Sequence, residues 1–578
     1  MSDARLTEIK ERLEKDPNNF ERLEEYASYA DSHTDASIVE AAYTRLLDKY
    51  PLCYAYWKRY ADKVVSLGGG SESAIAGATA IYERSTETLK YSVENWLNYL
   101  RFMIANVPKG KGTGDKDATV ARIRALFDTA LDAIGDSFDA YDLWSLRLEF
   151  EQEHGGNRAV AGVFERANEV AMKSSALLWD RYLRFMNSVP FEEWLRDDEL
   201  RLWKDQHATL CHTPEDSQRL FTDTLRGAVE LRERVHNQSM TTVYRVAGFE
   251  STIAQRTFFH VTPLPENAVN GWRTYLQWAE VNEPFARAAR LYERCLIPAC
   301  FCTEFWFMYI AFLRRANAIP AAREVFQRGA RVHYSENLEF MIPYAIFEET
   351  YGGADKAEAI YRQLMAMTAV QGKSATAAAS RSSTRGVEVT MKYAAFLRRT
   401  GKLAECRALF EEATAAHNGM SRRTLFLLLH YARFVEQLGD PDAARALYVR
   451  ATREYADTFM AWEHALAFED RRRRFSGEAA AQAQTAGAAL LHRAVLDSCP
   501  LAEEEKRRLW RRWWRVTGTW ENSLETVLAV DADYALVCGG ARPVWVHDNL
   551  DGEPPEKLAK LSSNAPSSGV PATSLLTI

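Results

Sequence analysis

One stretch of the chain carries the same order of residues twice, and this repetition restricts the fold more than any other feature. Each copy has aromatic residues at positions i, i+3 and i+6, followed by a run that starts Ala-Ala-Arg and reaches another aromatic residue. The first aromatic set is Trp272, Tyr275 and Trp278, and the second is Trp306, Tyr309 and Phe312. The copies are 34 residues apart, a period that is typical of stacked helical hairpins.

Each copy predicts a pair of helices. Aromatic residues three apart lie on one face of a first helix, and the alanines of the second helix permit close packing against it. A single pair cannot bury its apolar face, so neighbouring pairs must stack to form a continuous core. The sequence therefore predicts an all-α fold, an α-solenoid of helical hairpins, and a role as a scaffold.

The pattern recurs along most of the chain but is interrupted once. Between Trp179 and Trp272 no hairpin pattern is found, although helices are predicted at 191–208, 214–235 and 240–256. The stretch 214–235 opens with Thr-Pro, which is typical of a capped helix start. We interpret this interruption as a helical linker between two repeat arms.

These observations define four predicted regions. The C-terminal arm contains a predicted loop at 366–386, rich in Ala, Ser and Thr. The last region has no aromatic residue from Asn549 onward and is rich in Pro and Ser, so we expect it to be largely disordered. The predicted regions are an N-terminal repeat arm at 1–187, a linker at 188–270, a C-terminal arm at 271–535 and a tail at 536–578.

The repeat aromatics are expected to form the core of the solenoid. Truncation of such a residue to Ala should cost roughly 3–5 kcal/mol of stability. These residues explain why a scaffold is stable, and they do not indicate what it binds. The predicted core residues are Trp96, Trp144, Trp179, Trp272, Tyr275, Trp306 and Tyr309.

Composition excludes several classes of protein. The net charge of −7 gives no global attraction to nucleic acid or to an anionic membrane. No apolar run approaches the roughly 20 residues that cross a bilayer, and the N-terminus lacks the apolar core of a signal peptide. The eight cysteines are scattered through helical patterns, as expected of reduced thiols in the cytosol or nucleus.

No arrangement of residues predicts catalysis, a cofactor or a metal. The run Gly372-Lys373-Ser374 resembles the end of a phosphate-binding loop, but the required earlier glycine is Met367, so a flexible loop is favoured. Two groups could ligate zinc, but neither has a second ligand pair at the usual spacing, and buried thiols are favoured. These groups are His207, Cys211 and His212, and Cys295, Cys300 and Cys302.

Three basic clusters are candidate contacts for RNA or an acidic partner, with a solvated surface as the alternative. Lysines at 109, 111 and 116 lie in a predicted loop, and the other clusters lie at the end of one helix and along the last helix. Cations near a helix C-terminus are favourable in any case. The candidates on these two helices are Arg471, Arg472, Arg473 and Arg474, and Arg507, Arg508, Arg511 and Arg512.

The last helix also carries an apolar stripe on the side opposite its arginines. Core or dimer packing is favoured over base stacking for this stripe, because its members share one helix face. Obligate dimer interfaces are apolar and commonly bury more than about 2,000 Å². The candidate dimer residues are Leu509, Trp510, Trp513 and Trp514.

The repeat pattern resembles the half-a-tetratricopeptide (HAT) repeat over most of residues 20–500. The ordinary tetratricopeptide repeat has a glycine-centred first helix, which these units lack. The stretch that contains Phe249-Glu250, the run 258–264 and the run 291–297 resembles the pre-mRNA-processing factor 39 family, with its paralogue pre-mRNA-processing factor 42. Phe259 stands where the family usually has Tyr, and 536–578 match no part of it.

This resemblance implies a nuclear scaffold of pre-mRNA splicing, associated with U1 snRNP proteins and 5′ splice-site recognition. It also implies dimerisation through the C-terminal repeats, as a homodimer or as a heterodimer with a related HAT protein. Two alternatives remain open: a HAT scaffold of mRNA 3′-end cleavage or rRNA maturation, and a tetratricopeptide-like adaptor for chaperone C-termini. The adaptor requires a basic carboxylate clamp, which the sequence does not show.

Overall fold

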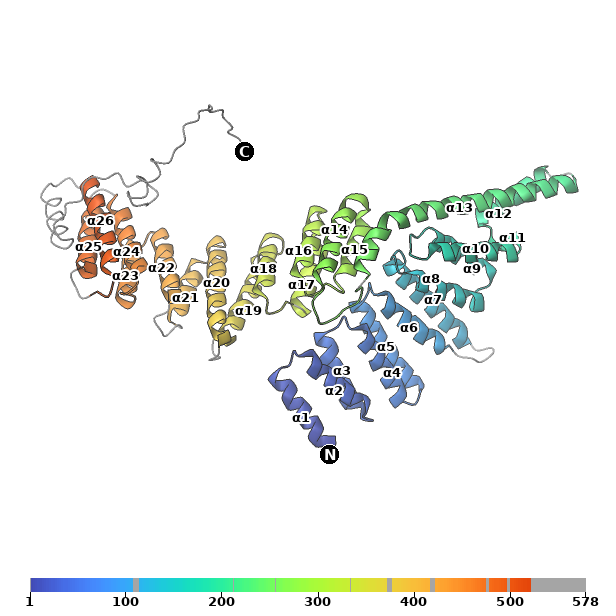
Figure 1. Cartoon of the computed structure of the whole chain (residues 1–578), viewed down its shortest axis with the longest axis horizontal. Coiled ribbons are helices and arrows are strands. Elements are labelled where there is room, and N and C mark those ends of the chain that lie inside the picture. The colour runs from blue at the N-terminus through green and yellow to red at the C-terminus, as the bar shows by residue number, and fades with distance from the viewer. Residues whose placement is uncertain are drawn as a thin grey trace, which may run out of the picture. The chain divides into compact units, whose positions relative to one another are not determined.

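The computed structural model describes residues 2–107, 114–210, 213–254, 256–332, 334–371, 377–415, 422–474, 478–495 and 499–520. Within these residues there are 26 helices and no strand, which confirms the predicted all-α repeat fold (Figure 1). The chain divides into two compact units, Met1–Ile360 and Tyr361–Ile578. This division differs from the predicted region boundaries, because contacts join the first C-terminal repeats to the N-terminal arm.

Ten helices form the N-terminal arm of the first unit. Polar residues at their starts accept hydrogen bonds from exposed backbone amides, as Asn19, Asp35, Ser71 and Ser92 do for α2, α3, α5 and α6. The helices are α1 Ser2–Lys15, α2 Phe20–Asp31, α3 Ala36–Lys49, α4 Tyr54–Leu67, α5 Glu72–Thr88, α6 Val93–Ala105, α7 Gly114–Ile134, α8 Tyr141–His154, α9 Asn157–Asn168 and α10 Ser175–Ser188.

Ring stacking between consecutive helices explains the spacing of the repeat aromatics. The aromatic residue of a second helix stacks on the aromatic at i+3 of the next first helix, with centroids 4.8–5.6 Å apart and planes within 18°. Eight pairs follow this rule: Tyr43–Tyr60, Tyr82–Tyr99, Phe164–Tyr182, Phe249–Tyr275, Tyr292–Tyr309, Phe326–Tyr344, Tyr361–Tyr393 and Phe410–Tyr431.

The repeat tryptophans have a second role besides filling the core. In four hairpins the indole Nε1 donates a hydrogen bond of 2.8–2.9 Å to the carbonyl oxygen six residues earlier, which fixes the preceding turn. These bonds run from Trp57 to Pro51, Trp96 to Lys90, Trp306 to Cys300 and Trp462 to Ala456.

Six of the seven predicted core residues are buried, with exposed fractions of 0–6%. They are Trp96, Trp144, Trp272, Tyr275, Trp306 and Tyr309. Trp179 is the exception, because it is only half-buried. Its ring lies on the His236 ring at 4.9 Å between centroids, at the edge of the packed layer.

The predicted linker contains α11 Phe191–Trp194, α12 Asp197–Leu210 and α13 Pro214–Ile253. The single helix predicted at 191–208 is wrong, because the chain breaks at 195–196, where the Arg196 amide donates to Glu199. The two helices predicted between 214 and 256 are also wrong, because they form one continuous helix of 40 residues. No Gly or Pro stands between them to stop it.

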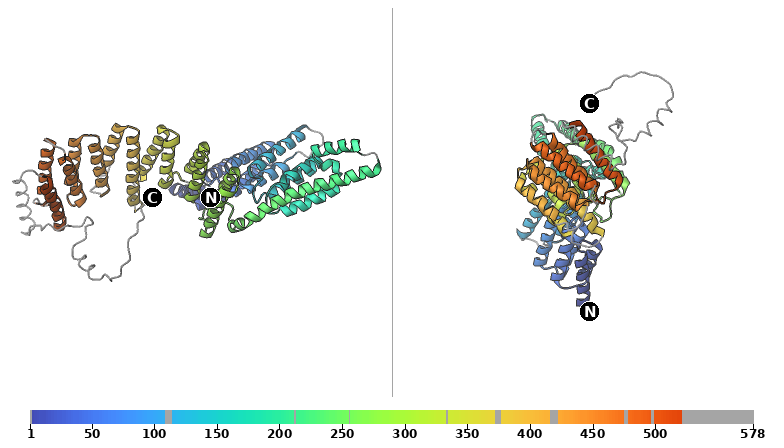
Figure 2. Two further views of the ribbon diagram at one scale, coloured as in Figure 1. Left: turned by 90° about the horizontal axis from the view of Figure 1, so that it is seen from above. Right: turned by 90° about the vertical axis from the view of Figure 1, so that its left-hand side faces the viewer.

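Helix α13 contacts α9 and α10 of the N-terminal arm and α12 of the predicted linker (Figure 2). Ser239, at the predicted break, donates to the Asn168 carbonyl at 2.7 Å, and Asn168 donates to the Arg232 carbonyl at 2.8 Å. Near its end, Phe249 stacks on Tyr275 at 5.0 Å. The end of α13 therefore acts as the second helix of a repeat, with α14 as the next first helix.

The remaining helices continue the hairpin order (Figure 1). The loop predicted at 366–386 is wrong at both ends, because α19 extends into it and α20 starts within it. The helices are α14 Glu266–Asn282, α15 Phe285–Cys295, α16 Thr303–Arg315, α17 Ile319–Val332, α18 Leu338–Tyr351, α19 Ala354–Gln371, α20 Ala377–Arg399, α21 Leu403–Ala415, α22 Arg422–Gln437, α23 Pro441–Glu454, α24 Phe459–Arg473, α25 Glu478–Val495 and α26 Glu503–Trp520.

Candidate functional site

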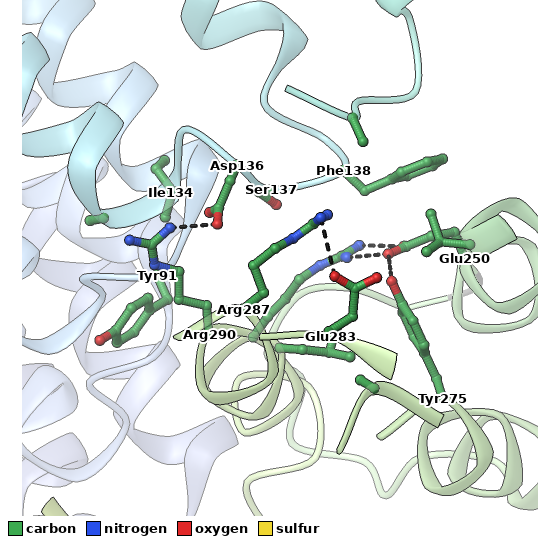
Figure 3. A pocket seen from close by; sticks show the side chains of 16 residues that line it. Tyr91, Ile134, Asp136, Ser137, Phe138, Glu250, Tyr275, Glu283, Arg287 and Arg290 are labelled. Carbon is green, nitrogen blue, oxygen red and sulfur yellow. Dashed lines mark hydrogen bonds and ion pairs between the residues drawn. The ribbon is translucent and has the colours of Figure 1, made fainter. Parts of the chain in front are cut away.

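Charged side chains join the N-terminal arm to the first C-terminal repeat inside the first unit (Figure 3). In the turn between α7 and α8, Asp136 accepts a hydrogen bond from Arg290 at 2.5 Å. Asp139 in the same turn accepts one from Arg294 at 2.9 Å. Both arginines lie on α15, and about 155 residues separate the partners in the chain, as the pair Asp139–Arg294 shows. The junction therefore links two regions that the sequence predicted to be separate.

The carboxylate of Glu250 on α13 is the centre of this junction. It accepts two hydrogen bonds from Arg294, at 2.7 and 2.8 Å, and one from the Tyr275 hydroxyl at 2.9 Å. Burial would lower the pKa of Arg294, but Glu250 and Asp139 raise it above its ordinary value. Burial, together with Glu250, raises the pKa of Tyr275. These charged groups are paired with one another and hold the two regions together.

The cavity at this junction has a volume of about 70 Å³. Sites for small molecules and cofactors usually measure about 300–1,000 Å³. Figure 3 shows that the arginines and carboxylates point across the cavity toward one another. This cavity is therefore not a small-molecule site.

A second, apolar contact lies beside the charged junction. Phe259 is 7% exposed and clusters with Cys53 and Cys300, which come from the N-terminal arm and from the turn after α15. Tyr50 and Phe301 place their rings at 6.2 and 5.7 Å from the Phe259 ring. The segment after α13 thus forms a wedge between the two regions and keeps them in one unit.

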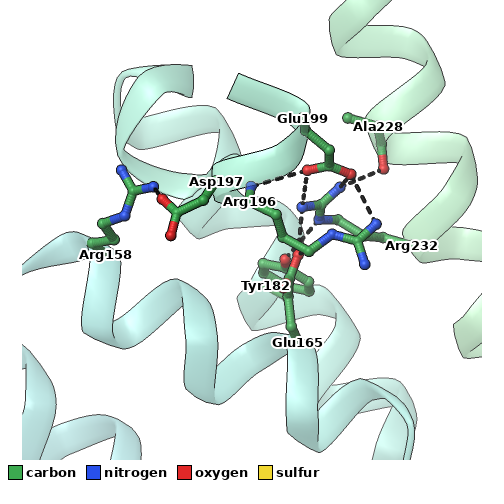
Figure 4. A network of polar contacts seen from close by, with 8 residues as sticks. All are labelled: Arg158, Glu165, Tyr182, Arg196, Asp197, Glu199, Ala228 and Arg232. Carbon is green, nitrogen blue, oxygen red and sulfur yellow. Dashed lines mark hydrogen bonds and ion pairs between the residues drawn. The ribbon is translucent and has the colours of Figure 1, made fainter. Parts of the chain in front are cut away.

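A buried ion network fixes the middle of α13 on its neighbours (Figure 4). Arg232 is 4% exposed and donates to Glu199 at 2.8 and 3.1 Å, to the Tyr182 hydroxyl at 2.9 Å and also to Glu165. Burial would raise the pKa of Glu199, but hydrogen bonds from Arg232 and Arg196 lower it to about 2. For Glu165 the effect of burial outweighs the attraction of Arg232 and Arg196, and its pKa is raised. All members have partners, so the network is structural.

An open groove of about 630 Å³ is the candidate binding site of the first unit. One wall consists of the turn between α3 and α4 and the segment 87–91. The other wall consists of α15, α16 and α17. Its lining mixes apolar and charged side chains, a mixture that suits a protein segment better than a metabolite. The lining includes Leu52, Leu296 and Val325, and the exposed Lys90, Glu324 and Arg331.

Several of the predicted basic residues form ion pairs with acidic residues of the same chain. Arg471 forms an ion pair with Glu436 at 2.7 Å, and Arg474 one with Asp470 at 3.7 Å. Arg472 is half-buried and also has a partner, and the side chain of Arg473 lies outside the described residues. The lysines at 109 and 111, and the side chain of Lys116, also lie outside them.

On α26, Arg512 pairs with Glu463 at 3.3 Å, and Arg508 lies over the Phe459 ring at 5.5 Å. Arg507 and Arg511 are exposed. Phe459 starts α24 whereas Arg471 is near its end, about 18 Å away at 1.5 Å per residue. The structure therefore places Arg508 away from Arg471, whereas Arg512 and Arg471 both act electrostatically on His464 of α24.

The candidate dimer residues differ in what the structure shows of them. Leu509 is 1% exposed and Trp510 is 4% exposed within a single chain. Both therefore pack inside one copy, where α26 contacts α24 and α25. The side chains of Trp513 and Trp514 lie outside the described residues. Dimerisation stays a prediction.

The predicted metal and phosphate candidates form no site in the described part of the chain. Cys295 and Cys300 are fully buried and free, and burial raises the pKa of both thiols. Cys302 is half-buried and free. No group of three His, Cys, Asp or Glu side chains suited to a metal occurs among the residues described. Cys211, His212 and the run 372–374 lie outside them.

No helix in the described ranges has the length and apolar character that crossing a bilayer requires.

Two family models match the chain. The model described as the PRP39 N-terminal HAT repeat matches residues 7–188, and the PRP39 C-terminal HAT repeat model matches residues 244–385. Together they cover more than half of the 578 residues. The second match begins inside α13, where the helix takes the place of a repeat second helix.

Individual relatives agree with these models. Pre-mRNA-processing factor 39 of Schizosaccharomyces pombe is 28% identical over 380 residues, which cover 61% of this chain and 59% of the relative. The Homo sapiens protein of that name is 24% identical over 370 residues, 61% of this chain and 54% of the relative. The aligned part thus spans little more than half of the length of these relatives.

More distant similarity extends to another protein group. Cleavage stimulation factor subunit 77 of Arabidopsis thaliana is 21% identical over 357 residues, 58% of this chain and 42% of the relative. The crystal structure of CSTF-77 aligns over 88% of this chain and 95% of that chain, with 13% identity and a TM-score of 0.43.

Proposed function

We propose, on the premise that this chain belongs to the PRP39 family of HAT-repeat proteins, that it is a non-catalytic scaffold of pre-mRNA splicing. In this proposal it works in the nucleus, associates with the U1 snRNP and supports 5′ splice-site recognition through protein–protein contacts. Curated relatives named pre-mRNA-processing factor 39 support the splicing role.

The observation that carries the proposal is the match of both repeat arms to one family. The matched ranges also contain residues that build the fold, since Tyr82–Tyr99 and Tyr292–Tyr309 stack in the same manner in the two arms. The charged junction between the arms supports a rigid scaffold, because Arg294 of the C-terminal arm binds Asp139 of the N-terminal arm and Glu250 on α13. A rigid scaffold holds its partners at fixed separations.

The groove of the first unit is the surface that we assign to a partner protein. Its apolar lining residues would contact partner side chains, while the exposed Lys90, Glu324 and Arg331 would select the partner's charge. The full chain, tagged and purified from the cells that make it, should recover U1 RNA and core spliceosomal proteins. Recovery of neither would contradict the proposal.

A groove variant makes this experiment sharper. Replacement of exposed Arg331 and Glu324 by residues of opposite charge should reduce recovery of U1 components at least several-fold without changing the thermal unfolding of the chain. The matched control is Lys356→Glu with Asp355→Lys, which reverses two charges on α19 outside the groove. Equal losses in both variants would show that the groove is not the contact surface.

A scaffold of mRNA 3′-end cleavage is the second candidate, and the similarity to Cleavage stimulation factor subunit 77 favours it. The same purification discriminates the two functions, because this candidate predicts cleavage factors without U1 RNA. A role in rRNA maturation predicts precursor rRNA instead.

Dimerisation belongs to the same proposal, as a homodimer or with a related HAT protein. Light scattering of the intact chain at micromolar concentration should give twice the 65.7 kDa of a single chain if the homodimer forms. A monomeric mass would exclude the homodimer at that concentration, and recovery of a related HAT protein in the purification would identify the heterodimer.

A further inference from the structure

The groove of the first unit contains an arginine whose guanidinium is only partly used by the chain. Arg328 on α17 lines the groove and donates a hydrogen bond of 2.7 Å to Glu293 on α15. Glu293 is its one carboxylate partner among the described residues. A guanidinium has five N–H donors in a planar fork, so most of the donors of Arg328 have no partner within the described part of the chain.

The preceding hairpin shows how a second carboxylate completes an arginine at the same position. Arg294 and Arg328 each stand two residues after the stacked aromatic of their helix and lie over the tryptophan of their own hairpin, at 5.9 and 5.8 Å. Arg294 binds Glu250 on the preceding second helix, as Arg328 binds Glu293. Arg294 also donates to Asp139 at 2.9 Å. Pairing with one carboxylate therefore does not prevent this arginine from binding another.

A further arginine of the first unit also binds two carboxylates. Arg232 lies over the Trp194 ring at 5.1 Å and forms ion pairs with two glutamates. The side chains of Arg294 and Arg232 are 14% and 4% exposed, whereas that of Arg328 is 30% exposed. This difference agrees with a missing second partner, because such a partner would cover the open side of the guanidinium.

An arginine at the same repeat position outside the groove serves as a comparison. Arg166 lies over the Trp144 ring at 5.8 Å and pairs with Asp128 at 3.4 Å. Its side chain is 53% exposed, so water can satisfy its remaining donors. The repeat position alone therefore does not define a site. What distinguishes Arg328 is its place in the lining of an open groove.

The charges around Arg328 favour a single carboxylate over a chain of phosphates. Burial would lower the pKa of Arg328, but Glu293 raises it, so the guanidinium stays positive. Exposed Arg331 adds a cation about one turn further along α17 and has no ion pair within the described residues. The exposed acids Glu87 and Glu324 line the same groove, and neither forms an ion pair with Arg328 in the described ranges. These acids would repel the successive phosphates of RNA.

We propose that the groove binds a partner protein segment through one acidic side chain, which forms ion pairs with Arg328 and Arg331. This carboxylate takes the role that Asp139 has for Arg294. Apolar side chains of the segment contact lining residues such as Leu52. The inference rests on the proposed function, since it names the chemistry of the partner at the same groove.

The test starts from random 12-residue peptides, displayed on phage and selected on the immobilised full chain. The selected peptides should share one Asp or Glu beside apolar residues. Binding of the best peptide, labelled with fluorescein, is then measured by fluorescence anisotropy. Exchange of its acidic residue for the amide should weaken binding at least about tenfold, because charge-assisted hydrogen bonds are lost. This comparison leaves the chain itself unchanged.

Variants of the chain assign this loss to Arg328. On the Arg328→Gln chain the acidic and amide peptides should differ less than about twofold, because the partner of the carboxylate is gone. Arg328→Lys keeps a positive charge beside Glu293, and with it the fold, but loses the second side of the fork, so it should also reduce the difference. The matched control is Arg166→Gln, which should keep the full difference. Thermal unfolding of each variant checks that it is folded.

Three results would overturn the inference. The selection could enrich no peptide, or peptides without a shared acidic residue. The full difference between the two peptides could persist on the Arg328→Gln chain. A 12-nucleotide oligouridine could displace the peptide at equal charge concentration, which would indicate RNA in the groove instead. Failure of the proposed function looks different: U1 components would be absent from the purified chain although acidic peptides still bind through Arg328.

Discussion

Tyr292 on α15 stacks on Tyr309 on α16, with ring centroids 4.9 Å apart and planes at 11° to each other. Seven other pairs along the chain repeat this contact between a second helix and the next first helix. Each stack joins only two neighbouring helices, so each hairpin packs mainly on the hairpins next to it. The stability of a repeat should therefore depend on its own aromatics and those of its neighbours.

Trp306→Ala should lower the free energy of unfolding of the first unit by about 3–5 kcal/mol. The side chain is 2% exposed, and its Nε1 holds the Cys300 carbonyl at 2.9 Å, so both packing and a hydrogen bond are lost. Urea unfolding followed by tryptophan fluorescence and circular dichroism measures the change. Val281→Ala is the control, because Val281 is 83% exposed and should change stability by less than about 0.5 kcal/mol.

The buried ion pair between Arg323 and Glu348 should be replaceable as a unit. Glu348 is 1% exposed, and Arg323 binds its carboxylate at 2.8 and 3.2 Å, so Arg323→Ala leaves a buried charge and should cost about 3–5 kcal/mol. The preceding repeat has Ala289 and Leu313 at the equivalent positions. The double variant with Glu348→Leu should therefore recover most of the stability in urea unfolding.

The Arg232 network should make the free energy of unfolding depend on pH in the acidic range. Glu199 has a folded pKa of about 2 against an ordinary value of 4.5, so its contribution is complete above about pH 4.5 and is lost as the pH falls toward 2. Glu199→Gln should therefore destabilise the chain at pH 7, and the difference from the unmodified chain should shrink below pH 4.5. Glu169→Gln, at an exposed carboxylate without an ion pair in the described residues, should show no such difference.

Reversal of charges in the Asp136–Arg290 ion pair should change the hydrogen exchange of the charged junction. Arg290→Asp places a carboxylate against Asp136 and should increase hydrogen exchange in residues 135–138 and 257–262. Asp136→Arg combined with Arg290→Asp restores opposite charges and should restore protection. If the single variant leaves exchange unchanged in both segments, the ion pair does not hold the junction.

Much of the fold could be predicted because its signals are local. A first helix needs aromatics at i, i+3 and i+6 to bury one face, so the spacing of Trp306 and Tyr309 predicts that both are buried. The same argument fails at Trp179, where the neighbouring α13 leaves the indole half-covered. The sequence does not indicate that α13 is one continuous helix. Its packing partners change along its length, which alters the apolar pattern, although no helix-breaking residue interrupts it.

The candidate sites were harder to predict, because they depend on residues far apart in the chain. Nothing near Asp136 indicates Arg290, and nothing near Leu52 indicates Val325 across the groove. Runs of consecutive arginines indicate exposed charge in the sequence, but the partners of these arginines come from other helices, so Arg471 and Arg512 each have a partner inside the chain.

Cross-linking mass spectrometry on the complex purified from native cells tests the central claim most directly. Lys90, exposed at the edge of the groove, is the reporter, because an amine-reactive cross-linker on it reaches any protein bound there. The account predicts cross-links from Lys90 to proteins of the U1 snRNP, lost in the Arg331 and Glu324 variant. Cross-links from Lys90 to cleavage factors alone, or no U1 protein in the complex, would contradict it.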